Sequence, residues 1–316
     1  MLNRRYLRVK VLQALYIFFI NGGRDIKEAE REMLQSIDRI YDLYLYMLRL
    51  IVEIRDVAGK RIEESSHKKL PTEDDLDPNT KFVDNLVIAQ IAQNLPFQKL
   101  IEDKKINWQE EQELVSKLFK HIRETALYQS YMSDRSNEYG SDKQFIGQLF
   151  IKHIAGFELL HDTLEEKSIY WLDDLMLVNI IVDKTLQSFR QNHSNKLPIV
   201  FSLYKNEIDD RKFVRELLIK TTENNKEYET LIAEKTKNWE LDRIAVLDMI
   251  LMKMALCEFE CFKTIPVKVS LNEYIELSKS YSTPKSKFFI NGVLDKLAAD
   301  MKISGKIAKT GRGLIE

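Results

Sequence analysis

The chain has 316 residues, enough for about two domains, and carries a formal net charge of −1. This balance excludes a general attraction of the whole chain to a polyanion, so only a local patch could bind one. Hydrophobic residues make up 44% and charged residues 31%, while Gly (10) and Pro (6) are scarce. Such a composition favours long helices with charged exposed faces.

No apolar run reaches the ~18 residues of a membrane span. Arg5, Arg8 and Lys10 interrupt the N-terminal apolar run, so we expect no signal peptide and no membrane partner. The only two cysteines, Cys257 and Cys261, lie four residues apart, and a disulfide between them within one helix would be badly strained. Free thiols indicate a reducing compartment, and we expect a cytoplasmic protein.

Apolar residues recur with a period of 3.6, and strand-like alternation is hard to find, which predicts an all-α fold. The first helix is expected over 4–20, ending at Asn21-Gly22-Gly23. The second is expected over 26–64, followed by a polar loop over 65–80 that contains two prolines. Further helices are expected over 81–94, 109–132, 142–166, 173–191, 207–222, 225–236, 241–260, 270–281 and 284–301.

Sequence signals for the starts of helices are clearest in the last hundred residues. Ser270 and Glu273 match a capping box, and Thr283-Pro284 places a capping hydroxyl before a proline. The segment 242–259 has only five charged residues, so it should form the central helix, buried by its neighbours.

The basic N-terminus is the first candidate site. Arg4, Arg5, Arg8 and Lys10 fall in the first helix, and no acidic residue precedes Asp25. Arg4 and Arg8 lie on the same side as the apolar stripe, so this end of the helix is expected to overhang the core. Cations there oppose the helix dipole, and an anion would offset that cost. An ordinary solvated basic end, with arginine stems covering apolar surface, is the alternative.

The last helix offers the second candidate. Phe288 falls roughly opposite its apolar stripe, beside Lys285 and Gly292, and Phe289 lies on the flank. An aromatic ring on an outward face could contact a partner or stack on a base. Coverage of Phe288 by another helix is the alternative.

Signals for catalysis are weak. His153 and His161 are eight residues apart with Phe157 between them, but the five histidines are scattered and form no metal-ligand motif. No phosphate-binding glycine loop or nucleophile elbow occurs. Cys257 sits in the most apolar helix and is expected to be an inert core thiol. We therefore expect no enzyme, cofactor or metal.

Four stretches resemble the bacterial transcription antitermination factor NusB family. The first resembles that family's arginine-rich opening, and the others resemble its later helices: Arg4–Tyr16, Phe213–Leu218, Leu241–Phe259, and Ile265–Tyr281 followed by Lys287–Lys296. The resemblance covers about 1–24 and 205–301. It implies a NusB-like domain of two small helical bundles, made of 1–24 and 205–301. A large helical insertion of unknown role is expected over 25–204, and a flexible basic tail over 302–316.

The resemblance also implies a function. The family binds single-stranded boxA RNA of ribosomal-RNA transcripts together with the ribosomal protein NusE, and joins an RNA polymerase antitermination complex. It places the RNA-binding residues at Arg4, Arg5, Arg8, Lys10, Lys287 and Phe289. It places the partner-binding residues at Asp248, Lys285, Phe288 and Phe289, although Lys285 stands where members can carry an acid. The helical wheel favours Phe288 as the exposed ring, whereas the resemblance favours Phe289.

Two other functions remain open. A protein–protein scaffold could keep the fold without binding RNA, and a neutral or acidic surface around Arg4 and Arg8 would favour it. An enzyme is the third possibility, since the family fold also occurs fused to RNA methyltransferase domains. The extra region here is expected to be helical and lacks a Gly-rich cofactor turn.

Overall fold

The structure, a computed structural model, describes residues 2–134, 136, 138–171, 173–236 and 244–314. Within these ranges it contains helices and no strand, which confirms the predicted all-α fold. None of the described helices is both long and apolar enough to cross a bilayer.

The chain divides into two compact units. We call Asp38–Leu203 the central unit, and Leu2–Ile37 with Tyr204–Glu316 the terminal unit. The first turns of the second helix belong to the terminal unit, where Glu30 pairs with Arg215 at 2.8 Å. The division therefore falls at Asp38, thirteen residues after the start of the expected insertion at residue 25.

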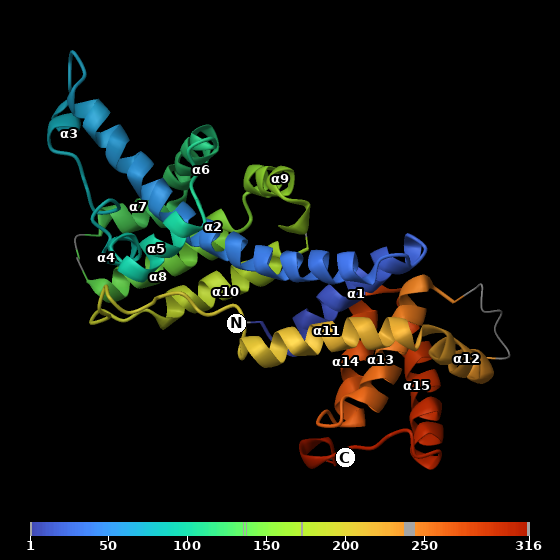
Figure 1. Cartoon of the computed structure of the whole chain (residues 1–316). Coiled ribbons are helices and arrows are strands. Elements are labelled where there is room, and N and C mark those ends of the chain that lie inside the picture. Colours follow the sequence, from blue (N-terminus) through green and yellow to red (C-terminus); the bar gives the residue numbers. More distant parts are fainter. Residues whose placement is uncertain (1, 135, 137, 172, 237–243, 315–316) are drawn as a thin grey trace. The chain divides into compact units, whose positions relative to one another are not determined.

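The terminal unit is built around one buried helix. Its helices are α1 (Arg4–Ile20), the start of α2 (Ile26–Ser66), α11 (Glu207–Glu223), α12 (Asn225–Lys235), α13 (Val246–Cys261), α14 (Val267–Tyr281) and α15 (Ser286–Ile303). Helix α13 packs against α1, α11, α12, α14 and α15 (Figure 1). Every residue from Ile250 to Phe259 is buried, so the prediction of a central apolar helix is confirmed. Its expected start at 241 lies outside the described residues.

The central unit contains shorter helices. They are the rest of α2, then α3 (Glu73–Leu76), α4 (Leu86–Ala92), α5 (Leu95–Asp103), α6 (Gln112–Glu124), α7 (Ala126–Ser133), α8 (Tyr139–Leu149), α9 (Glu158–Lys167) and α10 (Leu175–Ser188). A π-helix, Phe150–Ile154, follows α8 directly, and a short 3₁₀ helix, Ile169–Trp171, precedes α10. Helix α4 packs against α8, and α8 packs against α10.

The prediction of one helix over 109–132 is wrong, because Thr125 ends α6 and caps α7: its hydroxyl accepts from the Tyr128 amide at 3.2 Å. The helix predicted over 142–166 is likewise interrupted by the π-helix. Helix α5 was not predicted, and α3 lies in the segment expected to be a loop.

The predicted capping box at Ser270 is wrong. Helix α14 begins at Val267, with Pro266 as its cap residue. The Ser270 hydroxyl instead donates to Glu258 at 2.7 Å inside the terminal unit. Helix α15 begins at Ser286, two residues after Pro284.

Residues after α15 lie against the loop that follows α13. The Thr310 amide donates to the Lys263 carbonyl at 2.9 Å, and Lys309 Nζ donates to the carbonyls of Glu258 and Phe262, both at 2.9 Å. A Cβ atom on Gly313 would stand 2.0 Å from the Lys263 carbonyl oxygen, so only glycine fits there. Within the segment expected to be a flexible tail, residues 309–313 therefore contact the loop after α13.

Candidate nucleic-acid interface

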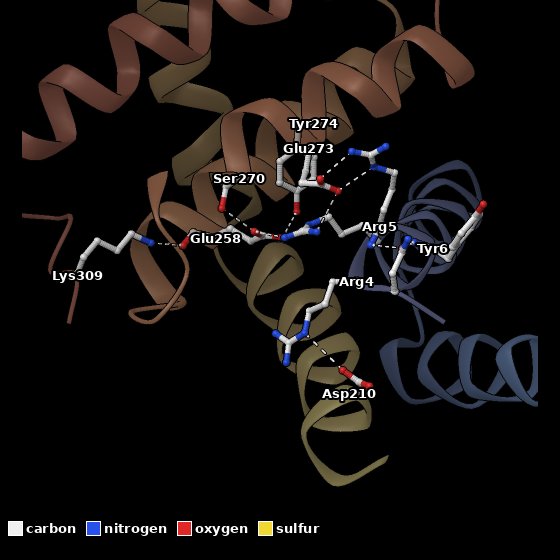
Figure 2. A network of polar contacts seen from close by, with 11 residues as sticks. Arg4, Arg5, Tyr6, Asp210, Glu258, Ser270, Glu273, Tyr274 and Lys309 are labelled. Atoms are coloured by element: carbon white, nitrogen blue, oxygen red, sulfur yellow. Dashed lines mark hydrogen bonds and ion pairs between the residues drawn. The ribbon is translucent and has the colours of Figure 1, made fainter. Parts of the chain in front are cut away.

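Helix α1 begins with three arginines and no acidic residue in its first turn. Asn3 caps it, and the Asn3 side chain accepts from the amides of Arg5 and Tyr6 at 3.0 and 3.1 Å. Cations at this end of a helix lie at the positive end of its dipole, so they require nearby anions. The structure supplies carboxylates from α11, α13 and α14 (Figure 2).

Arg8 forms a buried ion pair with Glu258 of α13. Arg8 Nε and Nη2 donate to the two Glu258 oxygens at 2.6 and 2.9 Å, and Arg8 is only 3% exposed. Ser270 and Tyr274 of α14 also donate to Glu258, both at 2.7 Å. Both carboxylate oxygens therefore have two donors each, which offsets the cost of removing the charges from water.

The pKa shifts agree with this geometry. Burial alone would raise the pKa of Glu258, but attraction to Arg8 and the hydrogen bonds from Arg8, Ser270 and Tyr274 lower it below its usual value. Burial likewise opposes the charged form of Arg8, yet Glu258 raises the pKa of the Arg8 guanidinium. Both groups remain charged in the interior.

Arg4 and Arg5 are also paired, but they reach solvent. Arg5 donates to both oxygens of Glu273, at 3.0 and 2.8 Å, and its side chain is 46% exposed. The hydrogen bond to Glu273 raises the pKa of Arg5. Arg4 lies 3.4 Å from Asp210, stacks on the Phe213 ring at 4.3 Å, and is 41% exposed.

These positions correct part of the expected site. We expected the basic end of α1 to overhang the core, but Arg8 is walled in by α13 and α14, and Lys10 is buried as well. A polynucleotide cannot reach the Arg8 guanidinium in this arrangement, because Glu258 occupies its donors. Arg4 and Arg5 remain accessible, and each contacts one carboxylate, the buried Asp210 and the partly exposed Glu273.

The start of α15 presents the second part of the expected site. Phe288 is 72% exposed, and Lys287 Nζ lies 4.8 Å from the centre of its ring. Phe289 is half-buried. The exposed aromatic residue is therefore Phe288, as the helical wheel indicated.

The Glu276 carboxylate of α14 is affected by cations from both expected parts of the site, the start of α1 and the start of α15. Its pKa is lowered first by the hydrogen bond from Lys279, and Arg5 and Lys287 also lower it by charge attraction. Such an effect requires both cations to lie near the same carboxylate. Arg5 of α1 and Lys287 of α15 therefore both stabilise the charged form of Glu276.

Asp248 lies in the first turn of α13, 5% exposed, and accepts from the Ser286 hydroxyl at 2.7 Å. Within the described part of the chain, its Oδ1 atom is buried and has no hydrogen-bond partner. Such an atom is costly to bury unpaired. Lys285 precedes Ser286 and is exposed.

The histidines and cysteines do not form a metal site among the described residues. His121 and His153 approach each other, with ring centres 5.7 Å apart, whereas His161 Nε2 bonds to the Ala155 carbonyl at 2.7 Å. Cys257 and Cys261 are free thiols, the first of them buried.

The sequence did not predict the carboxylates that pair with the arginines of α1, namely Glu258, Glu273 and Asp210. Glu258 was the clearest available signal, because it is a charged residue in an otherwise apolar helix and calls for a buried cation. Glu273 was noticed only as a capping residue. Asp210 gave no sign of its partner, since it lies 206 positions from Arg4.

The terminal unit is thus an all-helical domain with a buried Arg–Glu pair in its interior, half-exposed arginines at the start of α1 and an exposed aromatic ring at the start of α15. The NusB family model matches residues 174–299, from α10 of the central unit to α15. This match begins well before residue 205, where the expected NusB-like remainder starts.

Three relatives bear the name transcription antitermination protein NusB. That of Salinibacter ruber is 38% identical over 138 residues, covering 42% of this chain and 86% of the relative. That of Chloroherpeton thalassium is 39% identical over 110 residues, 35% of this chain and 52% of the relative. That of Desulforamulus reducens is 42% identical over 86 residues, 27% of this chain and 60% of the relative. No solved structure matches. The chain belongs to the NusB family.

Proposed function

We propose that this protein binds single-stranded RNA as a transcription antitermination factor, recognising a boxA-type element in ribosomal-RNA transcripts together with the ribosomal protein NusE within an RNA polymerase complex. The observation that carries the proposal is the accessibility of Arg4 and Arg5 at the start of α1, 41% and 46% exposed, in a NusB-family domain. Guanidinium and ammonium groups bind phosphates, and exposed aromatic rings stack on unpaired bases.

RNA binding would exchange carboxylates for phosphates. Glu273 and Asp210 hold Arg5 and Arg4 in place while both guanidiniums remain near half-exposed. The Arg5–Glu273 pair is the more exposed of the two, and exposed ion pairs contribute typically about 0–1 kcal/mol, so a phosphate can displace Glu273 at small cost. Asp210 is buried, but it keeps the backbone amides of Lys205 and Asn206 as donors when Arg4 turns to a phosphate. Arg8 and Lys10 act from the interior, where Arg8 fixes α1 against α13.

Partner binding is proposed at Asp248, Lys285, Phe288 and the half-buried Phe289. Asp248 is buried, so it acts through Ser286, whose hydroxyl it holds at the start of α15 beside the exposed Lys285. Because the chain is near neutral, we expect it to bind RNA modestly alone and more tightly with a basic partner. Equal RNA affinity with and without NusE would count against this part of the proposal.

The test is a titration of fluorescently labelled boxA-type RNA at fixed salt. The double variant Arg4→Gln, Arg5→Gln should bind about tenfold more weakly, because two phosphate contacts are lost. Arg215→Gln is the matched control, since Arg215 is 51% exposed and also pairs with a carboxylate, Glu30. Equal loss in the control and the double variant would remove Arg4 and Arg5 from the site.

A protein–protein scaffold without RNA binding is the second candidate. It is favoured by one observation: all three arginines at the start of α1 are paired with carboxylates. Absence of RNA binding by the wild-type protein, with NusE binding retained, would establish it.

A further inference from the structure

Helix α10 carries apolar residues both on its buried face and on a face that is exposed to solvent. Leu177, Val178 and Ile181 are among its buried residues, yet Met176 is 78% exposed and Ile180 is 40% exposed. A helix that is apolar all round is expected to be buried. One face of α10 therefore lacks a partner within the described part of the central unit.

This face forms one wall of a groove with a volume of about 560 Å³. The π-helix provides another wall, closed by a hydrogen bond of 2.8 Å from the Ala155 amide to the Phe150 carbonyl. Its Ile151 side chain is 53% exposed. Turns of π-helix are rare and frequently occur at functional sites. The groove is lined by Phe150, Ile151, Ala155, His161, Leu175, Met176, Asn179, Ile180 and Asp183.

One polar atom of the groove, Asn179 Oδ1, lacks a donor. The Ala155 carbonyl accepts from His161 Nε2 at 2.7 Å and from Asn179 Nδ2 at 3.5 Å, which orients the Asn179 amide. Asn179 Oδ1 is buried with no hydrogen-bond partner among the described residues. Asp183, one turn further along α10, adds a carboxylate. An occupant should therefore bring hydrogen-bond donors and positive charge.

The distribution of charge points the same way. The central unit contains 21 Lys and Arg against 27 Asp and Glu, a net charge of −6, whereas the terminal unit contains 27 against 22, a net charge of +5. A net charge of −6 disfavours a nucleic acid at the central unit and favours a basic partner.

We propose that the groove of the central unit binds a basic amphipathic α-helix of a partner protein. The apolar face of that helix packs on Ile151, Met176 and Ile180, one of its donors reaches Asn179 Oδ1, and a Lys or Arg side chain pairs with Asp183. In helix-in-groove recognition the bound helix places apolar anchors, about one helical turn apart, in an apolar groove. The site is separate from the proposed RNA interface, and it assigns a role to the central unit.

The probe is a hydrocarbon-stapled peptide of about 18 residues, roughly five helical turns, with Leu along one face and Lys on the other. A second peptide replaces Lys by Glu, and a third scrambles the order of the first. Binding to the full chain is measured by fluorescence anisotropy. The basic peptide should bind at least about tenfold more tightly than the other two, a difference of about 1.4 kcal/mol.

The variant Met176→Ser, Ile180→Ser should weaken binding of the basic peptide about tenfold, and Asp183→Asn should reduce its salt dependence. Ile208→Ser is the matched control, because Ile208 is an apolar residue of the terminal unit that is 81% exposed. All substituted positions reach solvent, and thermal melts confirm folding. RNA affinity should not change in the groove variants, which separates this site from the proposed function.

Three results would overturn the proposal. The first is equal binding of the three peptides, or equal loss in the control and groove variants. The second is a dimer of the wild-type chain that Met176→Ser, Ile180→Ser dissociates, which would make a second copy the occupant. The third is a loss of RNA affinity in that variant, which would make the groove part of the RNA interface.

Discussion

Arg8 and Glu258 carry opposite charges in the interior of the terminal unit. Moving each charge out of water costs several kcal/mol, and only complete pairing offsets that cost. Glu258 receives donors from Arg8, Ser270 and Tyr274, so the pair joins α1, α13 and α14 at one point. At the residue scale, this pair fixes the start of α1 and with it the positions of Arg4 and Arg5.

Glu258→Gln should lower the free energy of unfolding by about 3–5 kcal/mol, because it leaves the buried Arg8 charge without its counter-ion. The double variant Arg8→Met, Glu258→Met should recover most of that loss, since it buries no charge. Urea unfolding measures both. A double variant as unstable as the single one would show that packing, rather than charge, dominates this position.

Acid should weaken the same pair. The folded-state pKa of Glu258 lies below its ordinary value of 4.5, so its contribution to stability is present above pH 4.5 and is lost as pH falls through the folded pKa. Below about pH 4.5, the wild type should therefore lose unfolding free energy relative to the double variant Arg8→Met, Glu258→Met. A difference that stays constant from pH 7 to about pH 3 would contradict this assignment.

Phe288 is the ring available for stacking at the start of α15. Phe288→Ala should reduce RNA binding by about 1–3 kcal/mol while leaving its salt dependence unchanged, because stacking involves no phosphate. Phe289→Ala is the comparison, since Phe289 is half-buried. A larger loss of RNA affinity in Phe289→Ala, without loss of stability, would make Phe289 the RNA contact, as the resemblance to the family implies, and not Phe288.

At the scale of elements, sequence periodicity predicted α1 over the residues it occupies and α13 as the buried centre. It failed where a residue near a helix end has a tertiary role. Ser270 and Glu273 have the spacing of a capping box, but their side chains bind Glu258 and Arg5, which lie far away in the sequence. Local patterns cannot reveal such partners.

Breaks inside long helical patterns were also missed. Thr125 ends α6 and caps α7 without any Gly or Pro to mark the boundary. The π-helix after α8 has no sequence signal of its own, because its residues fit an ordinary helical pattern.

The position of the segment after α15 depends on the close approach of Gly313 to the Lys263 carbonyl. Gly313→Ala should displace residues 304–314, because its Cβ would stand 2.0 Å from the Lys263 carbonyl oxygen. Trypsin should then cleave at Lys306 and Lys309 faster than in the wild type. Gly140→Ala is the control, since a Cβ at Gly140 meets nothing within 4 Å. Unchanged cleavage in Gly313→Ala would show that this approach does not hold the tail.

At the scale of the whole molecule, a net charge of −1 conceals an acidic central unit and a basic terminal unit. The sequence indicated which residue types form the candidate site and which family the terminal regions resemble. It could not show that Arg8 is buried, because its partner Glu258 is 250 positions away. For the exposed ring of α15 it gave two answers, Phe288 from the helical wheel and Phe289 from the resemblance, and only the structure decided between them.

The most direct test of the proposed RNA interface is the salt dependence of boxA-type RNA binding. With Arg4, Arg5 and Lys287 as the phosphate contacts, log K against log salt should have a slope of about −2 for a single strand. The variant Arg4→Gln, Arg5→Gln should reduce the slope to about −0.7. A slope that remains near −2 in this variant would place the phosphates elsewhere on the protein and contradict the account.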